Sequence, residues 1–89
     1  MSQVMSNETV ILPSLGAGED ALNGGRVVFW LVEIGQPVRV GGDLLEIETD
    51  KAAFVVPSPV GGILRKKLVQ EDDDVKVGDS LAVIELGCG

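Results

Sequence analysis

A gapless internal repeat constrains the fold of this chain more than any other feature of its sequence. When the sequence is shifted by 37 positions (61 minus 24), the Gly-Gly pair at residues 24–25 falls on the Gly-Gly pair at residues 61–62. With the same shift, Val-Arg-Val-Gly at residues 38–41 falls on Val-Lys-Val-Gly at residues 75–78. A repeat of this period indicates two copies of one supersecondary unit that pack on each other.

Each copy has the hydrophobic pattern of short β-strands. Leu45 and Ile47 alternate with Glu46 and Glu48, which is the period-2 pattern of a strand with one buried face. Glycine, proline and aspartate residues separate the apolar runs and predict turns between them. The strands are expected at residues 9–12, 26–32, 38–40, 44–48, 52–56, 63–69, 75–77 and 81–86.

The two copies agree on which side chains face the core. Leu45 and Ile47 map onto Ala82 and Ile84, so the same phase points inward in both halves. A unit of this length is too short to be stable alone. The repeat therefore predicts an all-β fold in which two small sheets pack face to face with pseudo-two-fold symmetry.

The core of such a fold has to be small and mostly aliphatic. The chain has 89 residues, of which 45% are apolar and only 3% aromatic, with no tyrosine. This length and composition suit one domain with a core of Val, Leu, Ile and Ala side chains. We place the domain at residues 8–86, between a flexible arm at residues 1–7 and a tail or linker start at residues 87–89.

The copies differ most at residues 28–30, where Val-Phe-Trp falls on the basic triplet at residues 65–67. A basic triplet indicates that part of this strand faces solvent in the second copy. We expect Trp30 in the core or at its rim, and the alternative is that Val28 or Trp30 contributes to a surface contact patch.

The charge of the chain argues against several classes of partner. Fourteen acidic and 7 basic residues give a net charge of -7, so nucleic acid and anionic membrane surfaces are poor partners. Cys88 is the single cysteine, so no internal disulfide forms. Residues 1–8 match neither a signal nor a transit peptide, and no segment has the length of a membrane span. We expect the bacterial cytoplasm, with the mitochondrial matrix as the alternative if a transit peptide is absent from this sequence.

Few residues suit catalysis or metal binding. The chain has no histidine, which excludes Ser-His and Cys-His nucleophiles. Alternation places Glu46 and Glu48 on the open face of the sheet, where they are solvated. The acidic residues 71–74 lack the glycine and closing glutamate of an EF-hand loop, and a solvated turn is predicted there. Gly35 falls opposite Asp72, which fits a backbone position with left-handed geometry.

A glycine-rich segment at residues 16–21 matches the G-x-G-x-x-A pattern of dinucleotide sites. That pattern requires a helix that opens within it, but glycines and a β pattern follow at once. A plain loop is therefore favoured.

Lys51 lies between the two copies and has no partner in the repeat. Residues 49–52 are expected to form the turn of a hairpin that joins the last strand of one copy to the first strand of the next. Lys51 then projects into water, far from the chain ends. A turn lysine is usually only solvated, so its position alone assigns it no role.

Five segments within residues 8–86 resemble the lipoyl domain of dihydrolipoamide acyltransferases, which are components of 2-oxo-acid dehydrogenase complexes. They are LPSLG at residues 12–16, WLV at 30–32, GGD at 41–43, ETDKA at 48–52 and VPSPVGG at 56–62. The most specific element is DKA at residues 50–52, because sister biotinyl domains usually carry methionines on both sides of their modified lysine.

This resemblance implies a flattened barrel-sandwich hybrid of two four-stranded antiparallel sheets. It also implies that lipoic acid is joined to Lys51 by an amide bond, which removes the charge of the lysine. Asp50 and Ala52 would be the flanking residues that are recognised around the attachment point.

The resemblance also implies a set of partners. Glu48 and Thr49, with Glu19 and Asp20 from the loop before the second strand, would contribute to partner recognition. The partners would be a lipoate-protein ligase or lipoyl transferase, a thiamine-diphosphate decarboxylase, an acyltransferase core and the flavoprotein dihydrolipoamide dehydrogenase.

By the same resemblance, the domain is a monomeric carrier and not an enzyme. It would carry acyl groups and electrons between active sites, and a complex of the pyruvate dehydrogenase type is favoured. Two alternatives remain open. One is an unmodified barrel-sandwich module that only contacts other proteins, and the other is a biotin carrier domain of a carboxylase.

Overall fold

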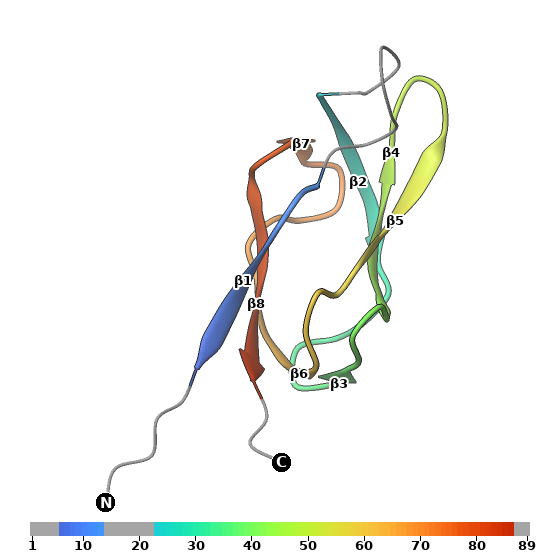
Figure 1. Ribbon diagram of the computed structural model, residues 1–89. Helices are drawn as coiled ribbons and strands as arrows, with labels where there is room; N and C mark the ends of the chain where they lie inside the picture. The colour runs from blue at the N-terminus through green and yellow to red at the C-terminus, as the bar shows by residue number, and fades with distance from the viewer. Residues whose placement is uncertain (1–5, 14–22, 87–89) are drawn as a thin grey trace, which may run out of the picture.

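The computed structural model describes residues 6–13 and 23–86, and all of its regular structure is β-strand. Figure 1 shows two layers of strands with the hairpin of residues 43–57 at one end. This confirms the predicted all-β class. The strands are β1 (Asn7–Ile11), β2 (Gly24–Trp30), β3 (Pro37–Val38), β4 (Asp43–Glu48), β5 (Ala53–Pro57), β6 (Gly62–Lys67), β7 (Asp74–Lys76) and β8 (Ser80–Leu86).

The strands form two four-stranded antiparallel sheets, as expected. One sheet has the order β1-β8-β6-β3 and the other has the order β5-β4-β2-β7. Each sheet takes an edge strand from the other half of the chain, because β3 of the first copy pairs with β6 and β7 of the second copy pairs with β2. Neither copy therefore completes a sheet alone.

The repeat extends to the irregularities of the strands. Val28 in β2 and Arg65 in β6 are both skipped in the pairing ladder, and so are Leu44 in β4 and Leu81 in β8. Each pair differs by 37 positions (65 minus 28, and 81 minus 44). Such β-bulges reorient one side chain, which explains why Leu44 is fully buried together with its neighbour Leu45.

Left-handed backbone geometry also repeats. Gly35 has φ of 95° and Asp72 has φ of 74°, which confirms the expected equivalence of these two turn positions. Gly41 and Gly78 form a second pair, with φ of 81° and 95°. Aspartate is one of the few residues other than glycine that tolerate this region.

The core lies between the two sheets. The predicted inward phase is confirmed, since Leu45, Ile47, Ala82 and Ile84 are all fully buried. Aliphatic side chains from both copies complete the core, namely Val10, Leu12, Val27, Val38, Leu44, Val56, Leu64, Val75 and Leu81.

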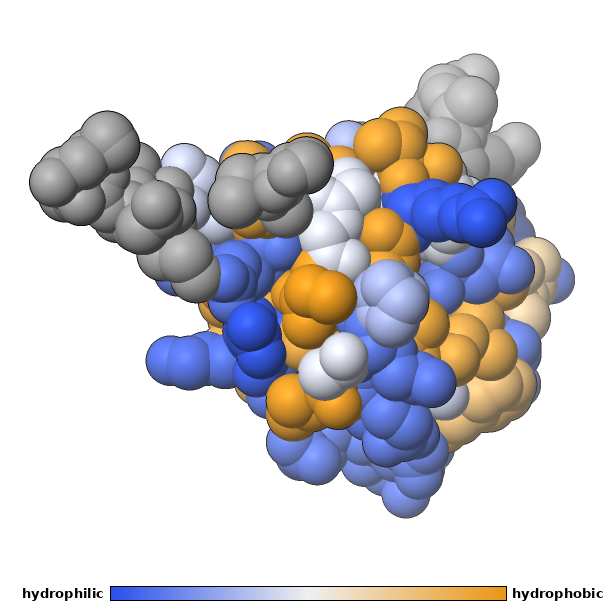
Figure 2. Space-filling model, turned by 90° about the horizontal axis from the view of Figure 1, so that it is seen from below, coloured by the Kyte–Doolittle hydropathy of each residue, from blue (hydrophilic) through white to orange (hydrophobic). Residues whose placement is uncertain are grey.

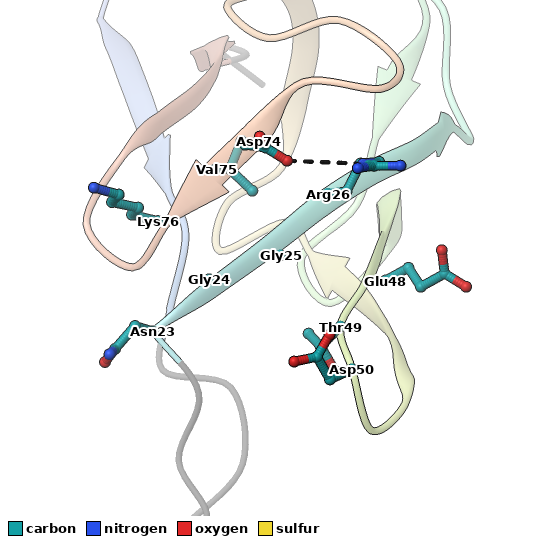
Figure 3. Close-up of a pocket in the computed structure, with 10 residues that line it drawn as sticks. All are labelled: Asn23, Gly24, Gly25, Arg26, Glu48, Thr49, Asp50, Asp74, Val75 and Lys76. Atoms are coloured by element: carbon teal, nitrogen blue, oxygen red, sulfur yellow. Dashed lines mark ion pairs between the residues drawn. The ribbon is translucent and has the colours of Figure 1, made fainter.

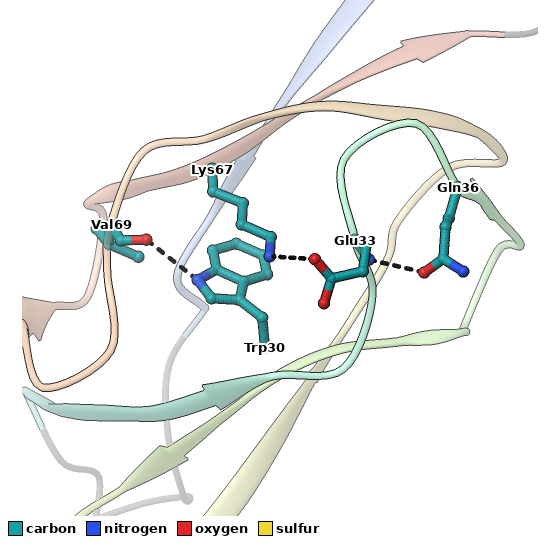
Figure 4. Close-up of polar contacts among 5 residues, drawn as sticks. All are labelled: Trp30, Glu33, Gln36, Lys67 and Val69. Carbon is teal, nitrogen blue, oxygen red and sulfur yellow. Dashed lines mark hydrogen bonds and ion pairs between the residues drawn. The ribbon is translucent and has the colours of Figure 1, made fainter.

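Trp30 packs at the rim of this core, as predicted. Its indole Nε1 donates a hydrogen bond to the Val69 carbonyl oxygen at 3.1 Å. The Nζ atom of Lys67, its partner in the repeat, lies 5.3 Å from the centre of the ring and 3.6 Å from Oε1 of Glu33 (Figure 4). Phe29, and not Trp30, is the exposed aromatic residue of β2.

Several strand ends differ from expectation by one or two residues. β2 ends at Trp30 and not at residue 32, and β3 ends at Val38 and not at residue 40. Val40 is 72% exposed, so the Val-Arg-Val pattern extends past the strand into the turn. β1 already begins at Asn7, one residue before the expected start of the domain.

The glycine-rich segment at residues 16–21 and Cys88 lie outside the described residues. Within residues 6–13 and 23–86, no helix has the length and hydropathy that crossing a membrane requires. The same residues contain no cluster of three or more His, Cys, Asp or Glu side chains arranged to hold a metal ion.

Candidate functional site

Lys51 lies at the tip of the β4–β5 hairpin, and this confirms the predicted turn. β4 ends at Glu48 and β5 starts at Ala53, so residues 49–52 form the loop. Figure 1 shows this loop at the end of the molecule opposite the start of β1 and the end of β8. Lys51 is exposed, and the loop holds its backbone away from the core.

The hairpin loop is closed by hydrogen bonds of Thr49. The Thr49 N–H donates to the Ala52 carbonyl oxygen at 2.8 Å, and the Thr49 hydroxyl donates to the same oxygen at 2.8 Å. The Thr49 hydroxyl also accepts hydrogen bonds from the N–H of Lys51 at 3.2 Å and of Ala52 at 3.1 Å. The side chain of Thr49 therefore orders the backbone on both sides of the lysine.

Four of the other residues expected around Lys51 are described by the structure, namely Glu48, Thr49, Asp50 and Ala52. Asp50 and Ala52 flank the lysine in the loop and are exposed. Glu48 is the last residue of β4 and is also exposed, as alternation predicts. Glu19 and Asp20, the other two expected recognition residues, lie outside the described residues.

A cleft lies at the base of the hairpin. It is lined by residues 23–26 at the start of β2, by residues 48–50 at the end of β4 and by residues 74–76 of β7 (Figure 3). Arg26 lies opposite Glu48 in the sheet, and its Nε is 3.7 Å from Oδ1 of Asp74. Both partners of this ion pair are largely exposed, so it contributes little to stability.

The sequence patterns did not indicate the contribution of β2 to this cleft. Gly25 lies against the end of β4, where an added Cβ would be 2.5 Å from the Glu48 carbonyl oxygen. Only a glycine allows this close approach of two backbones. The duplication of Gly25 as Gly62 is the signal that could have identified it.

The opposite end of the molecule has a different surface. Figure 2 shows this end, where apolar side chains lie among charged ones. The turns after β2 and β3 expose two large apolar residues, Ile34 (58%) and Val40 (72%). The lysine-bearing loop instead consists of three polar residues and an alanine.

This arrangement presents a primary amine on an ordered and accessible loop. A lysine in such a place can be acylated without any rearrangement of the core, because no core side chain belongs to the loop. No histidine is present in the chain to activate a nucleophile. The exposed amine therefore suits covalent attachment of a group.

Comparison with known proteins gives a family and several relatives. The family model Biotin_lipoyl, described as "Biotin-requiring enzyme", matches residues 8–84. The chain is 38% identical over 76 residues to the dihydrolipoyllysine-residue acetyltransferase component of the pyruvate dehydrogenase complex of Corynebacterium glutamicum. It is 42% identical over 75 residues to the component with the same name from Mycobacterium bovis.

A third relative belongs to another system. The chain is 34% identical over 87 residues to the dihydrolipoyllysine-residue acetyltransferase component of the acetoin cleaving system of Pseudomonas putida. The three matches cover 85%, 84% and 98% of this chain. They cover only 11%, 13% and 22% of the relatives, so the chain corresponds to a small part of those proteins.

Solved structures share the fold. The urea carboxylase of Kluyveromyces lactis matches with a TM-score of 0.74 and 25% identity, over 94% of this chain and 7% of that protein. The lipoyl domain of the 2-oxoglutarate dehydrogenase complex of Azotobacter vinelandii matches with a TM-score of 0.65 and 23% identity, over 91% of this chain and 98% of that domain. The match of the family model to most of the chain, on this fold, shows that the chain belongs to the Biotin_lipoyl family.

Proposed function

We propose that this domain is a lipoyl carrier in which lipoic acid is joined by an amide bond to Nζ of Lys51. The observation that carries the proposal is the position of Asp50-Lys51-Ala52 at the exposed tip of an ordered hairpin. The names of the relatives, which state a dihydrolipoyllysine residue, support the same assignment.

The residues of the hairpin fit such a group. The backbone of Lys51 is held by the Thr49 hydroxyl, and its side chain is exposed. When bound, a lipoyl group carries acyl groups and electrons through its dithiolane ring. The contribution of the chain is to present the amine to a modifying enzyme and then to hold the attachment point still while partner enzymes approach it.

The surroundings of Lys51 supply features that partners can recognise. Asp50 and Ala52 flank the attachment point, and Glu48 extends the exposed surface along β4. In our proposal Thr49, Glu19 and Asp20 complete this recognition region. A lipoate-protein ligase or lipoyl transferase would bind it first, followed by the decarboxylase, the acyltransferase core and the flavoprotein of a 2-oxo-acid dehydrogenase complex.

We further propose that the complex is of the pyruvate dehydrogenase type. The two relatives at 38% and 42% identity are components of such complexes, which supports this choice over the acetoin system at 34%. In this proposal the domain includes Asn7, the first residue of β1, in addition to the expected residues 8–86, acts in the bacterial cytoplasm and has no catalytic activity of its own.

The decisive experiment is intact-mass analysis after co-expression of the chain with a lipoate-protein ligase and lipoic acid. We expect the mass of one added lipoyl group, complete loss of the adduct in Lys51→Arg, and an unchanged adduct in the matched control Lys66→Arg. Lys66 is an exposed lysine on β6. An unmodified wild-type chain, beside a control domain that is modified, would overturn the proposal.

A biotin carrier is the second candidate, and the likeness to urea carboxylase favours it. Co-expression with a biotin ligase and biotin distinguishes the two. We expect no biotin adduct on this chain. A biotin adduct on Lys51 without a lipoyl adduct would replace the lipoyl proposal.

The type of complex is tested with the lipoylated domain and three purified decarboxylases, specific for pyruvate, 2-oxoglutarate and branched-chain 2-oxo acids. We expect the highest kcat/KM for acylation of the domain with the pyruvate enzyme. A higher kcat/KM with either of the other enzymes would assign the domain to that complex instead.

A further inference from the structure

The hydroxyl of Thr49 uses its complete hydrogen-bonding capacity inside the hairpin loop. A threonine hydroxyl has one hydrogen to donate and two lone pairs to accept with. Here it donates to the Ala52 carbonyl oxygen and accepts from the N–H groups of Lys51 and Ala52, at distances of 2.8, 3.2 and 3.1 Å. One side chain therefore satisfies both backbone N–H groups on the C-terminal side of the loop.

The Thr49 hydroxyl acts together with the main chain in closing the loop backbone. One backbone hydrogen bond closes it, from the Thr49 N–H to the Ala52 carbonyl oxygen at 2.8 Å. No residue of the loop has a positive φ, so the loop does not use the glycine-dependent turns that close tight hairpins. The hydroxyl of Thr49 thus replaces backbone hydrogen bonds that a regular turn would supply.

Thr49 is also anchored to the rigid part of the domain. Its side chain is half-buried, unlike those of the three loop residues that follow it. A Cβ added to Gly25 of β2 would lie 3.1 Å from the Cγ2 methyl of Thr49, so this methyl lies directly over the β2 backbone. The methyl faces the sheet, and the hydroxyl holds the loop.

From these contacts we infer that Thr49 is a positioning residue, which fixes the backbone of Lys51 in the orientation that the modifying enzyme requires. This inference rests on the proposed modification of Lys51. It assigns to Thr49 a role inside the domain, distinct from direct contact with a partner. A modifying enzyme that meets a preorganised loop does not have to order it, and this lowers the free energy of the productive complex.

The test compares Thr49→Val with Thr49→Ser. Valine retains the shape and the methyl against Gly25 but has no hydroxyl, whereas serine retains the hydroxyl. The first measurement is amide hydrogen exchange in the unmodified domain. In Thr49→Val we expect exchange at Lys51 and Ala52 to be about tenfold faster, because both N–H groups lose their acceptor. In Thr49→Ser, exchange at both amides should stay within about twofold of wild type.

The second measurement is the rate of lipoylation by a lipoate-protein ligase. We expect kcat/KM to fall by about tenfold in Thr49→Val and to be restored in Thr49→Ser. Thermal unfolding of both variants verifies that the fold is intact. Exchange at core amides of Leu45 and Ile47 serves as an internal reference, since these positions do not contact the loop hydroxyl.

The possible outcomes separate this inference from the proposed function. A wild-type chain that is not modified at all overturns the proposed function. A modified wild type with equally rapid modification of Thr49→Val overturns the positioning role alone, as does unchanged exchange at Lys51 and Ala52. If Thr49→Ser is as slow as Thr49→Val, the hydroxyl alone does not fix the loop, and the inference is wrong.

Discussion

The two ends of the molecule are related by the pseudo-two-fold symmetry, but only one of them is a hairpin. At one end, the Thr49 N–H donates to the Ala52 carbonyl oxygen and closes the β4–β5 loop. At the other end, the Leu86 N–H donates to the Ser6 carbonyl oxygen in the β8–β1 pair, also at 2.8 Å. Thr49 and Leu86 differ by the repeat offset of 37 positions.

The β4–β5 pair and the β1–β8 pair have equivalent backbones, and the hairpin loop is added to the first pair. Val10 of β1 pairs with Ala82 as Val56 of β5 pairs with Leu45, and all four side chains are buried. The strand pair is thus the same at both ends. Asp50 and Lys51 are the two residues that convert the β4–β5 pair into a closed loop, and the positions 37 residues further on, 87 and 88, lie outside the described residues.

The connections on the N-terminal side of the second strand also differ in length. β1 corresponds to β5 with an offset of 46 positions (56 minus 10), whereas the following strands correspond with an offset of 37. Measured between equivalent positions, the stretch from Val10 to Gly24 is therefore nine residues longer (46 minus 37) than the stretch from Val56 to Gly61. Glu19 and Asp20, two of the proposed recognition residues, belong to the longer segment.

Truncation of core side chains should cause the greatest loss of stability, and it tests whether the two halves are equally packed. Ile47→Ala and Ile84→Ala should each lower the free energy of unfolding by about 2 to 5 kcal/mol, since each truncates a fully buried side chain. Urea denaturation of the two variants measures both values. A cost below about 1 kcal/mol at one position would show that the two halves are not equally packed.

Glycine substitutions test how the two ends of the molecule differ. Gly25→Ala and Gly62→Ala should each cost about 1 to 3 kcal/mol, because the new Cβ would lie 2.5 Å from the Glu48 carbonyl oxygen or 2.1 Å from that of Glu85. Only Gly25→Ala should also slow lipoylation of Lys51, since it disturbs the hairpin end. Equal ligase kinetics for the two variants would contradict this difference.

Trp30 and Lys67 are symmetry partners that contact each other. Trp30→Phe should cost about 1 to 2 kcal/mol, because it removes the hydrogen bond to the Val69 carbonyl oxygen. Lys67→Met should cost less than about 1 kcal/mol, through loss of the cation–π contact and the ion pair with Glu33. A double-mutant cycle of Lys67→Met with Trp30→Leu, which removes the aromatic ring, gives their coupling by chemical denaturation, and a coupling of zero would show that the cation–π contact contributes nothing.

The two left-handed turn positions, Gly35 and Asp72, should respond differently to substitution, and the change at Asp72 should be the smaller. Gly35→Ala should cost about 1 to 2 kcal/mol, because a non-glycine residue is strained at this φ, although no atom lies within 4 Å of the added Cβ. Asp72→Gly should change stability by less than about 0.5 kcal/mol, because aspartate tolerates this region and glycine raises the entropy of the unfolded chain. Thermal unfolding measures both, and a larger loss for Asp72→Gly would reveal a role for its carboxylate.

Much of the fold could be predicted from local patterns. Alternation in residues 44–48 predicts the buried Leu45 and Ile47, and the repeat carries the same phase to Ala82 and Ile84. The alignment of Gly35 with Asp72 predicts a shared left-handed position. These features depend on periodicity and on local backbone preference, which a sequence displays directly.

Other features could not be predicted because they depend on contacts between distant residues. The alternating pattern does not predict the burial of Leu44, which follows from a β-bulge opposite β5. Trp30 contacts its own symmetry partner Lys67 across the molecule. Alignment of the two copies shows only that these two residues differ in type. The threonine of the ETDKA motif shows no sign in the sequence that its hydroxyl holds the loop.

The repeat in the amino-acid sequence specifies two copies of one β unit with a lysine-bearing loop between them. The exchange of β3 and β7 between the sheets, and the likeness of the β1–β8 pair to the hairpin, arise only in the folded molecule. Hydropathy periodicity specifies which face of a strand is buried but not which strand lies beside it. Strand partners are chosen by the packing of the whole core, which forms only when both copies come together.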